Sequence, residues 1–286
     1  LHFKRYCFTT QKFRKRLLSF ATTSANTNIN QESLEKIILS FPSLSEQQKI
    51  AAFLSAVDQK IQLLQRKKEL LEQYKKGIMQ KLFSQEIRFK REDGSDYPDW
   101  EEKKLGEYID LLSGFAFKGS TITENPSGKP LLRGINITEG EIRHSNEMDR
   151  YYLGPTDMLN KYIVIENDLV IGMDGSKVGK NSALISQVDE GALLVQRVAR
   201  IRPTVRSNIR YIYQLIRSPR FIRYVDTVNT SSGIPHISLK QIRDFIVPIP
   251  SLNEQNNIAD LLMEMDTNIS LTRLSISSMN YFKKGL

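Results

Sequence analysis

A loop rich in glycine and lysine is the first feature of this 286-residue chain that could do chemistry. It runs from Gly172 to Asn181 with the sequence GMDGSKVGKN. A nucleotide-binding P-loop, G-x-x-x-x-G-K-[ST], holds phosphates with its backbone amides and Mg²⁺ with its hydroxyl. That pattern would need glycine at position 174 and serine or threonine at 181, where the chain has Asp174 and Asn181. We therefore predict a turn or a phosphate-backbone contact here, and no ATP binding by this chain.

No other cluster has the composition of a catalytic or metal site. Pro98-Asp99 and Glu101-Glu102-Lys103 superficially match the PD…E-x-K carboxylates of metal nucleases. Those carboxylates come from two strands and need more chain between them, so solvated side chains in an acidic linker are the better interpretation. One cysteine and three scattered histidines supply neither a zinc set nor a nucleophile with its base. The sequence thus predicts no catalytic residue and no metal site.

The charge of the chain indicates a polyanionic partner instead. It carries 41 Lys and Arg against 32 Asp and Glu, a formal net charge of +9. Residues 92–174 hold 8 basic and 17 acidic side chains, whereas residues 177–243 hold 12 basic and 3 acidic ones. Nine of those 12 are arginine, whose planar fork suits phosphates and guanine edges. A basic protein without such a partner is the alternative that charge alone leaves open.

The sequence also indicates where the chain works. No stretch approaches the roughly 18 uninterrupted apolar residues of a transmembrane helix. The basic opening LHFKRY lacks the apolar core and cleavage site of a secretory signal. A single cysteine fits a reducing compartment. We therefore expect a cytoplasmic chain without a membrane partner.

An internal repeat defines the elements that must position the charged residues. The sequence PSLSEQ at Pro42 returns as PSLNEQ at Pro250, an offset of 208 residues. At that offset, residues 42–77 and 250–285 match at 14 of 36 positions without a gap. The period is too long for a solenoid. It indicates duplication of a unit that consists of a globular part followed by a long helix.

Each copy of the repeat predicts a long helix with a coiled-coil stripe. Proline disfavours helix before it, and Ser45 and Asn253 are the expected N-caps. The series 50, 54, 57, 61, 64, 68, 71, 75, 78, 82 then steps by four and three residues, the 3.5-residue period of a coiled coil, and the second copy repeats it from Ile258. We expect the two helices to pair with each other; independent coiled coils with separate partner chains are the alternative. The polar positions in this stripe are Lys68, Lys75 and Thr272.

Between the helices the pattern changes to short apolar runs bounded by glycine, asparagine and aspartate. This pattern is typical of a mixed α+β unit that follows a polar, turn-rich linker. The expected strands are Tyr162–Ile165, Leu169–Met173, Ser182–Ile185 and Val195–Arg202, and the expected helices are Asn208–Arg217 and Pro219–Val228.

Together these features resemble the specificity (S) subunits of bacterial type I restriction-modification systems. The specific part is the duplicated P-S-L-x-E-Q-x-x-I-A-x-x-L-x-x-x-D-x-x-I segment at 42–61 and 250–269. PDWEEKKLG at 98–106 is similar to the family's opening of a target recognition domain, and NDLVIG at 167–172 to one of its strands. TSSGIPHIS at 230–238 is similar to the segment before the conserved helix. The resemblance covers nearly the whole chain, although the strand motifs alone would be weak.

The resemblance implies an α+β fold in which a globular mixed α/β target recognition domain is flanked by two long conserved helices that pair as an antiparallel coiled coil. It implies a non-catalytic DNA-recognition subunit that directs methylation and restriction subunits to a site on double-stranded DNA. The assembled complex would be an adenine-specific DNA methyltransferase and an ATP-dependent endonuclease. S-adenosylmethionine would be bound by the methylation subunits, ATP and Mg by the restriction subunits, and no cofactor by this chain.

A full subunit would have two complete recognition domains, and here the chain departs from the family. Residues 21–41 pair with 229–249 at the same offset, as the tail of a first domain would. Because the chain begins with leucine, we expect its N-terminus to be processed, trimmed or a fragment. Two such chains could form a homodimer with two-fold symmetry and restore a bipartite reader, with a monomer as the alternative. The expected division is 1–41, C-terminal remnant of a first target recognition domain; 42–83, first long helix; 84–97, linker; 98–249, complete target recognition domain; and 250–286, second long helix.

The basic block 177–243 supplies the candidate DNA contacts. We expect Lys177 and Lys180 at phosphates, and Asn181 and Arg197 at base edges. Ordinary surface charge is the alternative for each of them. The remaining DNA candidates are Ser231, Ser232 and His236. On the long helices, the candidates for partner binding are Glu46, Gln47, Ile50, Ile61, Glu254, Gln255, Ile258 and Ile269.

Two other classes of function stay open at this point. One is a coiled-coil adaptor protein with a basic globular head and no sequence-specific DNA binding, and the other is an unrecognised enzyme. Retention on duplex DNA that falls steeply with salt would favour the DNA-binding subunit. An adaptor would retain a protein partner whatever the salt, and an enzyme would be active as a purified single chain.

Overall fold

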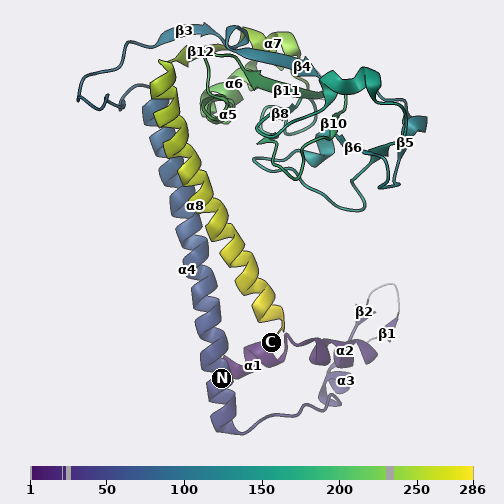
Figure 1. The fold of residues 1–286 in the computed structure, drawn as a ribbon. Helices are drawn as coiled ribbons and strands as arrows, with labels where there is room; N and C mark the ends of the chain where they lie inside the picture. The colour runs from purple at the N-terminus through teal and green to yellow at the C-terminus, as the bar shows by residue number, and fades with distance from the viewer. Residues whose placement is uncertain (1, 21, 24–26, 230–234, 286) are drawn as a thin grey trace. The chain divides into compact units, whose positions relative to one another are not determined.

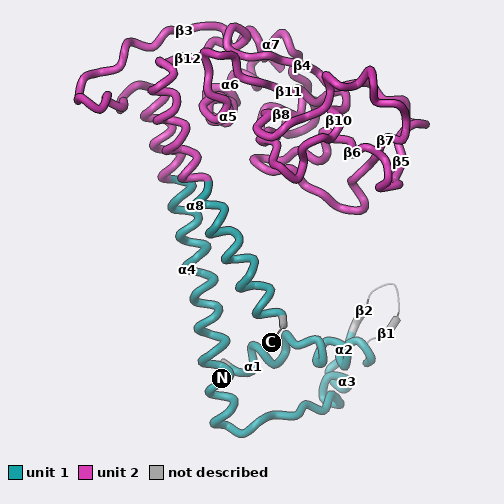
Figure 2. Tube along the Cα trace, viewed as in Figure 1, with its two compact units in different colours: residues 1–73, 267–286 teal, residues 74–266 magenta. Residues whose placement is uncertain are grey.

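A computed structural model describes residues 2–20, 22–23, 27–229 and 235–285 of the chain. The chain divides into two compact units, residues 1–73 with 267–286 (unit 1) and residues 74–266 (unit 2) (Figure 2). The two long helices, α4 (Leu44–Phe83) and α8 (Leu252–Gly285), each contribute a segment to both units. Among the described residues, no helix combines the length and apolarity needed to cross a membrane.

Unit 2 contains the mixed α+β domain. Its central sheet has the order β4-β11-β8-β9 with antiparallel neighbours, and Val198 of β11 pairs with Gly172 of β8. A second sheet has the order β10-β6-β7-β5, in which β10 and β6 are parallel. The strands of the central sheet are β4 (Ile109–Ser113), β8 (Leu169–Gly172), β9 (Ser182–Leu184) and β11 (Val198–Pro203). Those of the second sheet are β5 (Ile122–Thr123), β6 (Lys129–Leu132), β7 (Tyr151–Tyr152) and β10 (Leu193–Leu194). A separate antiparallel pair joins β3 (Glu101–Lys104) to β12 (Ile246–Ile249).

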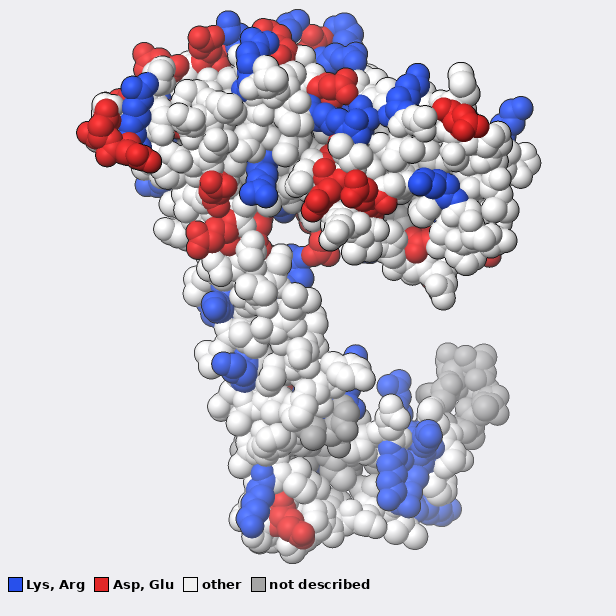
Figure 3. Space-filling view, in the orientation of Figure 1, with Lys and Arg blue, Asp and Glu red and all other residues white. Residues whose placement is uncertain are grey.

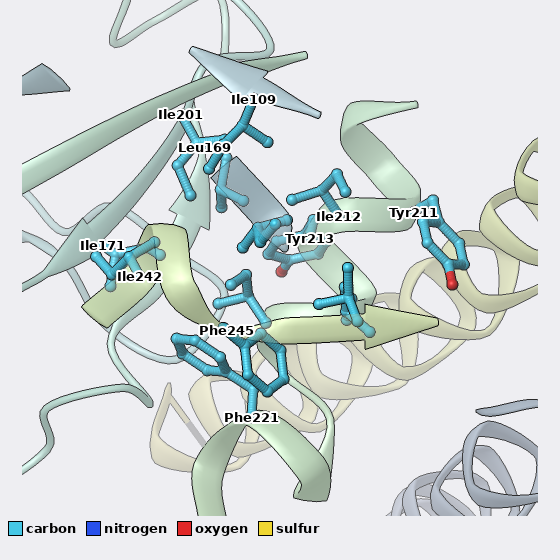
Figure 4. Packing of buried hydrophobic residues seen from close by; sticks show 14 of the residues in the cluster. Ile109, Leu169, Ile171, Ile201, Tyr211, Ile212, Tyr213, Phe221, Ile242 and Phe245 are labelled. Atoms are coloured by element: carbon cyan, nitrogen blue, oxygen red, sulfur yellow. The ribbon is translucent and has the colours of Figure 1, made fainter. Parts of the chain in front are cut away.

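Three helices pack against the central sheet and form the main core (Figure 4). They are α5 (Ile209–Ile216), α6 (Pro219–Val228) and α7 (Leu239–Asp244), and each begins after a side chain that caps its first turn: Asn208, Ser218 and Ser238. Leu169 and Ile201 of the sheet, Ile212 of α5 and Phe221 of α6 belong to this one cluster, and all four are fully buried. Burial of such side chains stabilises a domain by about 1.5–3 kcal/mol each.

The elements predicted from the sequence are largely present. The helices expected at 208–217 and 219–228 are α5 and α6, and the strands expected at 169–173 and 182–185 are β8 and β9. The strand expected at Tyr162–Ile165 is wrong, because a 3₁₀ helix (Asp157–Tyr162) is followed by a turn that the Asp168 carboxylate closes on the Ile165 amide. The strand expected at 195–202 is broken by a turn at Gln196 and Arg197, so that β11 begins at Val198.

The long helices begin earlier than their predicted caps. The first residues of α4 and α8 are Leu44 and Leu252, so Ser45 and Asn253 lie inside the helices and their prediction as N-caps is wrong. The Ser43 hydroxyl accepts a hydrogen bond from the Glu46 amide (3.3 Å), and the Glu46 carboxylate accepts one from the Ser43 amide (2.9 Å). This reciprocal S-x-x-E capping box satisfies two free amides at once, which explains the earlier start.

In each unit the segments of α4 and α8 lie side by side and run in opposite directions (Figure 1). The predicted 4-3 stripe faces inward: Val57 and Ile61 of α4, and Ile269 and Thr272 of α8, are buried in unit 1. This confirms an antiparallel helix pair within one chain.

Two ion pairs join the helices, and the repeat supplies both. Asp58 bonds to Lys283 in unit 1 (2.5 Å), and Lys75 bonds to Asp266 in unit 2 (2.6 Å). Asp266 and Lys283 lie 208 residues after Asp58 and Lys75. The polar position at Lys75 therefore has a reciprocal carboxylate partner in the facing helix. Burial lowers the pKa of Lys75, and the hydrogen bond from Lys283 lowers the pKa of Asp58.

The helices of the N-terminal segment correspond to α5, α6 and α7 of unit 2. This segment contains α1 (His2–Cys7), α2 (Gln11–Ser19) and α3 (Gln31–Glu35), with a short hairpin of β1 (Thr22–Thr23) and β2 (Thr27–Asn28) between the last two. When 208 is added to their residue numbers, α1, α2 and α3 fall within α5, α6 and α7, respectively. Their caps Thr10 and Asn30 fall on the caps Ser218 and Ser238. The duplication thus extends to the first described residue, farther than the sequence matches showed.

Candidate nucleic-acid interface

Three loops of unit 2 meet where β8 ends. The Met173 amide donates to the Arg197 carbonyl (2.9 Å), and the Ile237 amide donates to the Met173 carbonyl (2.8 Å). Asp174 forms a backbone bridge with His236, and the Gly172 amide donates to the Asn181 carbonyl (2.9 Å). We call the surface formed by residues 174–181, 196–197 and 235–236 the β8 end. Residues far apart in the sequence are thereby fixed beside one another by main-chain hydrogen bonds.

Five of the seven residues that the sequence predicts as DNA contacts lie at the β8 end. Exposure suits that role, because four of the five are exposed and the asparagine is half-buried. These residues are Lys177, Lys180, Asn181, Arg197 and His236. The other two predicted contacts, Ser231 and Ser232, lie outside the described residues. Charge and resemblance therefore selected residues that the fold brings together.

The glycines of the 172–181 loop have a structural role. Gly175 and Gly179 have φ values of 96° and 76°, a region that disfavours other residues. A Cβ atom at Gly179 would lie 2.8 Å from a methyl group of Val225, so the loop packs tightly onto α6. The loop is a pair of turns that presents Lys177 and Lys180 to solvent. A turn is one of the two structures that the sequence predicted here.

Carboxylates accompany two of the three cations at the β8 end. Lys177 Nζ lies 3.1 Å from Glu139, and Arg197 Nη1 lies 2.7 Å from Asp174. Lys180 has no ion-pair partner in the part of the chain that the structure describes. Exposed ion pairs of this kind contribute about 0–1 kcal/mol, so a phosphate can replace the carboxylate at little cost. The surface is a set of oriented donors, with far less net charge than the sequence block suggested.

The rest of the basic block is mostly used within the fold. Arg200, nearly buried, bonds to Asp110 (2.8 Å), and Arg202 holds the buried Asp168 through two nitrogens (2.5 and 2.9 Å). Burial lowers the pKa of Arg200, whereas the hydrogen bond to Asp168 raises the pKa of Arg202. The acidic partners belong to the 92–174 block, so the two blocks of opposite sign pair with each other. Figure 3 accordingly shows acidic and basic side chains interspersed on the visible face of unit 2.

Most of the helix residues proposed for partner binding are buried and cannot form an accessible surface. Glu254, Gln255 and Ile258 are 0, 1 and 0% exposed, and Ile61 and Ile269 pack between the helices of unit 1. Their assignment to a partner surface is therefore wrong. The buried start of α8 packs on the α+β domain of unit 2, where Ile258 and Leu262 belong to the main core.

Three residues of unit 2 donate hydrogen bonds to the buried start of α8. The Glu254 carboxylate accepts hydrogen bonds from Arg88 (3.1 and 2.9 Å) and from the Trp100 indole (2.9 Å). Gln255 accepts from the Asn208 amide (2.9 Å). Sequence reasoning missed this anchor, although Trp100, the only tryptophan in the chain, could have indicated it.

The first copy of the repeat has a different environment. Glu46 and Ile50 are exposed and Gln47 is half-buried, and Gln47 donates to the Pro42 carbonyl (2.9 Å). These three residues are the predicted partner contacts that stay accessible. Among the described residues, no three His, Cys, Asp or Glu side chains are arranged to hold a metal ion.

Comparison with known proteins gives consistent matches. Residues 2–73 and 97–278 match the family described as type I restriction modification DNA specificity domain. The chain is 28% identical over 293 residues to the type I restriction enzyme MjaVIII specificity subunit of Methanocaldococcus jannaschii, covering 98% of this chain and 68% of that one. It is 35% identical over 174 residues to the EcoAI specificity subunit of Escherichia coli, covering 58% of this chain and 28% of that one. A crystal structure of the type I restriction-modification S subunit from M. genitalium superposes with a TM-score of 0.65 at 18% identity, covering 99% of this chain and 70% of that one.

Proposed function

The chain belongs to the family of type I restriction modification DNA specificity domains, and we propose that it is the subunit that selects the DNA site for a type I restriction-modification complex. The observation that carries this proposal is the family match over both long helices and nearly all of the domain between them. In this role the chain binds double-stranded DNA in the cytoplasm and contributes no catalytic residue. Methylation subunits supply S-adenosylmethionine and adenine methylation, and restriction subunits supply ATP- and Mg-dependent cleavage.

The β8 end is the proposed DNA-binding surface. Lys177 and Lys180 contact phosphates, and Asn181 and Arg197 reach base edges. The exposure of the cations supports this division: a phosphate can exchange with Glu139 at Lys177 at little cost, whereas Asp174 holds one nitrogen of Arg197. Two further arginines of the domain, Arg200 and Arg202, are instead held in ion pairs with Asp110 and Asp168.

The helix pair of unit 1 is the proposed docking surface for methylation subunits. Large apolar side chains lie outside the buried 4-3 stripe, and such exposed groups mark interaction surfaces. Those that are half or more exposed are Leu44, Phe53, Leu63, Leu271, Leu274 and Tyr281. We propose these exposed residues as partner contacts in place of the buried ones that the sequence predicted. A second copy of the chain is a further proposed occupant of unit 1, and it would make a two-fold reader of a palindromic site.

A salt titration tests DNA binding at the β8 end. The K177A/K180A double variant removes two phosphate contacts, so the slope of log affinity against log salt should fall by about 2. Fluorescence anisotropy of a labelled duplex, with the chain bound to its methylation subunits, measures this slope. The control is K90A/K118A, which removes two exposed lysines of unit 2 outside the β8 end. Unchanged affinity and slope in K177A/K180A would reject the assignment. Salt-independent capture of a protein without DNA would favour the adaptor.

A further inference from the structure

Arg197 adopts a backbone conformation that its residue type disfavours. The Val198 amide donates to the Val195 carbonyl (3.2 Å) and closes a four-residue turn, in which Arg197 is the third residue with a φ of 66°. Positive φ at this position of a turn favours glycine or asparagine, because a Cβ atom crowds the following carbonyl oxygen and only a short polar side chain such as that of asparagine offsets this by local hydrogen bonding. Arginine here costs the fold roughly 1–3 kcal/mol.

The other two non-glycine residues with positive φ have ordinary explanations. Gln85 (φ 59°) follows the end of α4, where a left-handed residue commonly closes a helix. Asn167 (φ 66°) is the third residue of the turn before β8, and asparagine tolerates this conformation. Arg197 has neither explanation, which makes its side chain a candidate for a functional role.

The surrounding structure fixes the turn from several sides. The Gln196 amide donates to the Phe115 carbonyl (2.8 Å), and the Gly114 amide donates to the Val198 carbonyl (2.9 Å). A Cβ atom at Gly114 would lie 2.3 Å from the Val195 carbonyl oxygen, so only glycine allows this close approach. The Met173 amide holds the Arg197 carbonyl from the other side. Strained residues persist where neighbours determine them in this way, and they concentrate at functional sites.

The turn presents two long polar side chains with unused hydrogen-bonding groups. The Arg197 side chain is 65% exposed, and Asp174 contacts it through Nη1. Among the described residues, no hydrogen bond uses Nε or Nη2 of Arg197 or the side-chain amide of Gln196. Asp174 thus orients the guanidinium and leaves most of its donors available.

We propose that the turn of Gln196 and Arg197 reads bases in the major groove, with Arg197 on a guanine and Gln196 on an adjacent adenine. The inference rests on the proposed function and assigns the reading of particular bases to this turn. Arginine pairs through two nitrogens with O6 and N7 of guanine, and glutamine pairs likewise with N6 and N7 of adenine. A phosphate contact tolerates a flexible cation and needs no strained main chain, whereas bidentate pairing needs a fixed fork.

Three variants separate base reading from phosphate contact. R197K keeps the charge but removes the fork, R197G also relieves the strain, and Q196A removes the amide. The control N167G changes the matching turn position at the opposite end of β8. The chain bound to its methylation subunits is used to select duplexes from a randomised pool, and sequencing of the bound fraction gives the preference at each base pair.

We expect R197K and R197G to lose guanine preference at one base pair, by about 5- to 150-fold, with the other positions unchanged. Q196A should lose adenine preference at the neighbouring pair, and N167G should match the wild type. R197K should keep its affinity for non-specific duplex within about two-fold, because its charge is retained. R197G should melt at or above the wild-type temperature, since the strain is removed and the surface ion pair contributes little.

Two results would overturn the inference while the proposed function stands. One is an unchanged preference at every position in both Arg197 variants. The other is a uniform loss across all positions together with weaker non-specific binding, which would make Arg197 a phosphate contact or a purely structural residue. A wild-type complex that selects no sequence at all would instead reject the proposed function.

Discussion

Replacing Glu254 with alanine is expected to destabilise unit 2 by about 3 kcal/mol. Glu254 is fully buried and accepts three hydrogen bonds, two from Arg88 and one from the Trp100 indole. Its removal leaves a guanidinium and an indole N–H without their acceptor. Breaking a buried ion pair costs about 3–5 kcal/mol. Arg88 is 22% exposed and also donates to the Pro98 carbonyl (2.6 Å), so we expect the lower end of that range.

The duplication supplies a matched control. Glu46 occupies the same position in the first repeat, and its amide likewise donates to the preceding serine, but its carboxylate is exposed and accepts a hydrogen bond from Ser43. E46A should therefore lose less stability than E254A, with E254Q between the two because it keeps one acceptor oxygen. Trp100 is the chain's only tryptophan, so its fluorescence during urea unfolding reports on the Glu254 anchor directly. Equal losses of unfolding free energy in E254A and E46A would refute the assignment of a buried anchor.

Two further predictions concern charged groups elsewhere in the structure. D266A should lower the unfolding free energy by about 3 kcal/mol, because it leaves the ammonium of Lys75, with a side chain only 9% exposed, without its carboxylate. D58A should lose less stability, because its lysine partner is more exposed. Thermal unfolding that ranks the two variants in the opposite order would contradict this explanation. His144 bridges Asp189 (2.8 Å) and Asp149 (3.2 Å), and the hydrogen bond to Asp189 raises the pKa of His144 above 6.5. The stability that protonated His144 contributes is therefore complete below about pH 6.5 and is lost as the pH rises through the raised pKa. Melting temperatures between about pH 5.5 and 8.5 should show this loss in the wild type, whereas H144Q should lack it; parallel profiles for the two proteins would exclude the effect.

The long helices were predictable because their signals are local. A repeat, a 4-3 apolar series and a proline before each copy are read from adjacent residues, and the buried stripe at Val57 and Ile269 matches them. The start of each helix was misplaced by two residues, although the S-x-x-E pattern at Ser43 and Ser251 contained the correct signal. The turn at Arg197 was not predictable, because nothing in that run of strand-forming residues marks a left-handed arginine.

The site was predictable in composition and only partly in arrangement. Lys177 and Arg197 come together because β8 and β11 are neighbours, a consequence of strand register that the sequence does not show. For the same reason the pairing of Arg200 with Asp110 could not be foreseen. The sequence therefore overestimated how many basic side chains of the 177–243 block are available to a partner. The two copies of the repeat have the same Glu-Gln dipeptide, yet one is buried by the recognition domain and the other is not. Local identity therefore gave no indication of which copy could meet a partner.

In the proposed function, this chain selects the DNA sequence on which its partner subunits act. Sequencing of methylated bases across the native host genome, with and without the gene for this chain, measures that selection. We predict that one motif of methylated adenines disappears when the chain is removed and returns when it is restored, with the restored R197K variant accepting other bases at one position of the motif. The same motif, methylated to the same extent in the absence of the chain, would contradict the account.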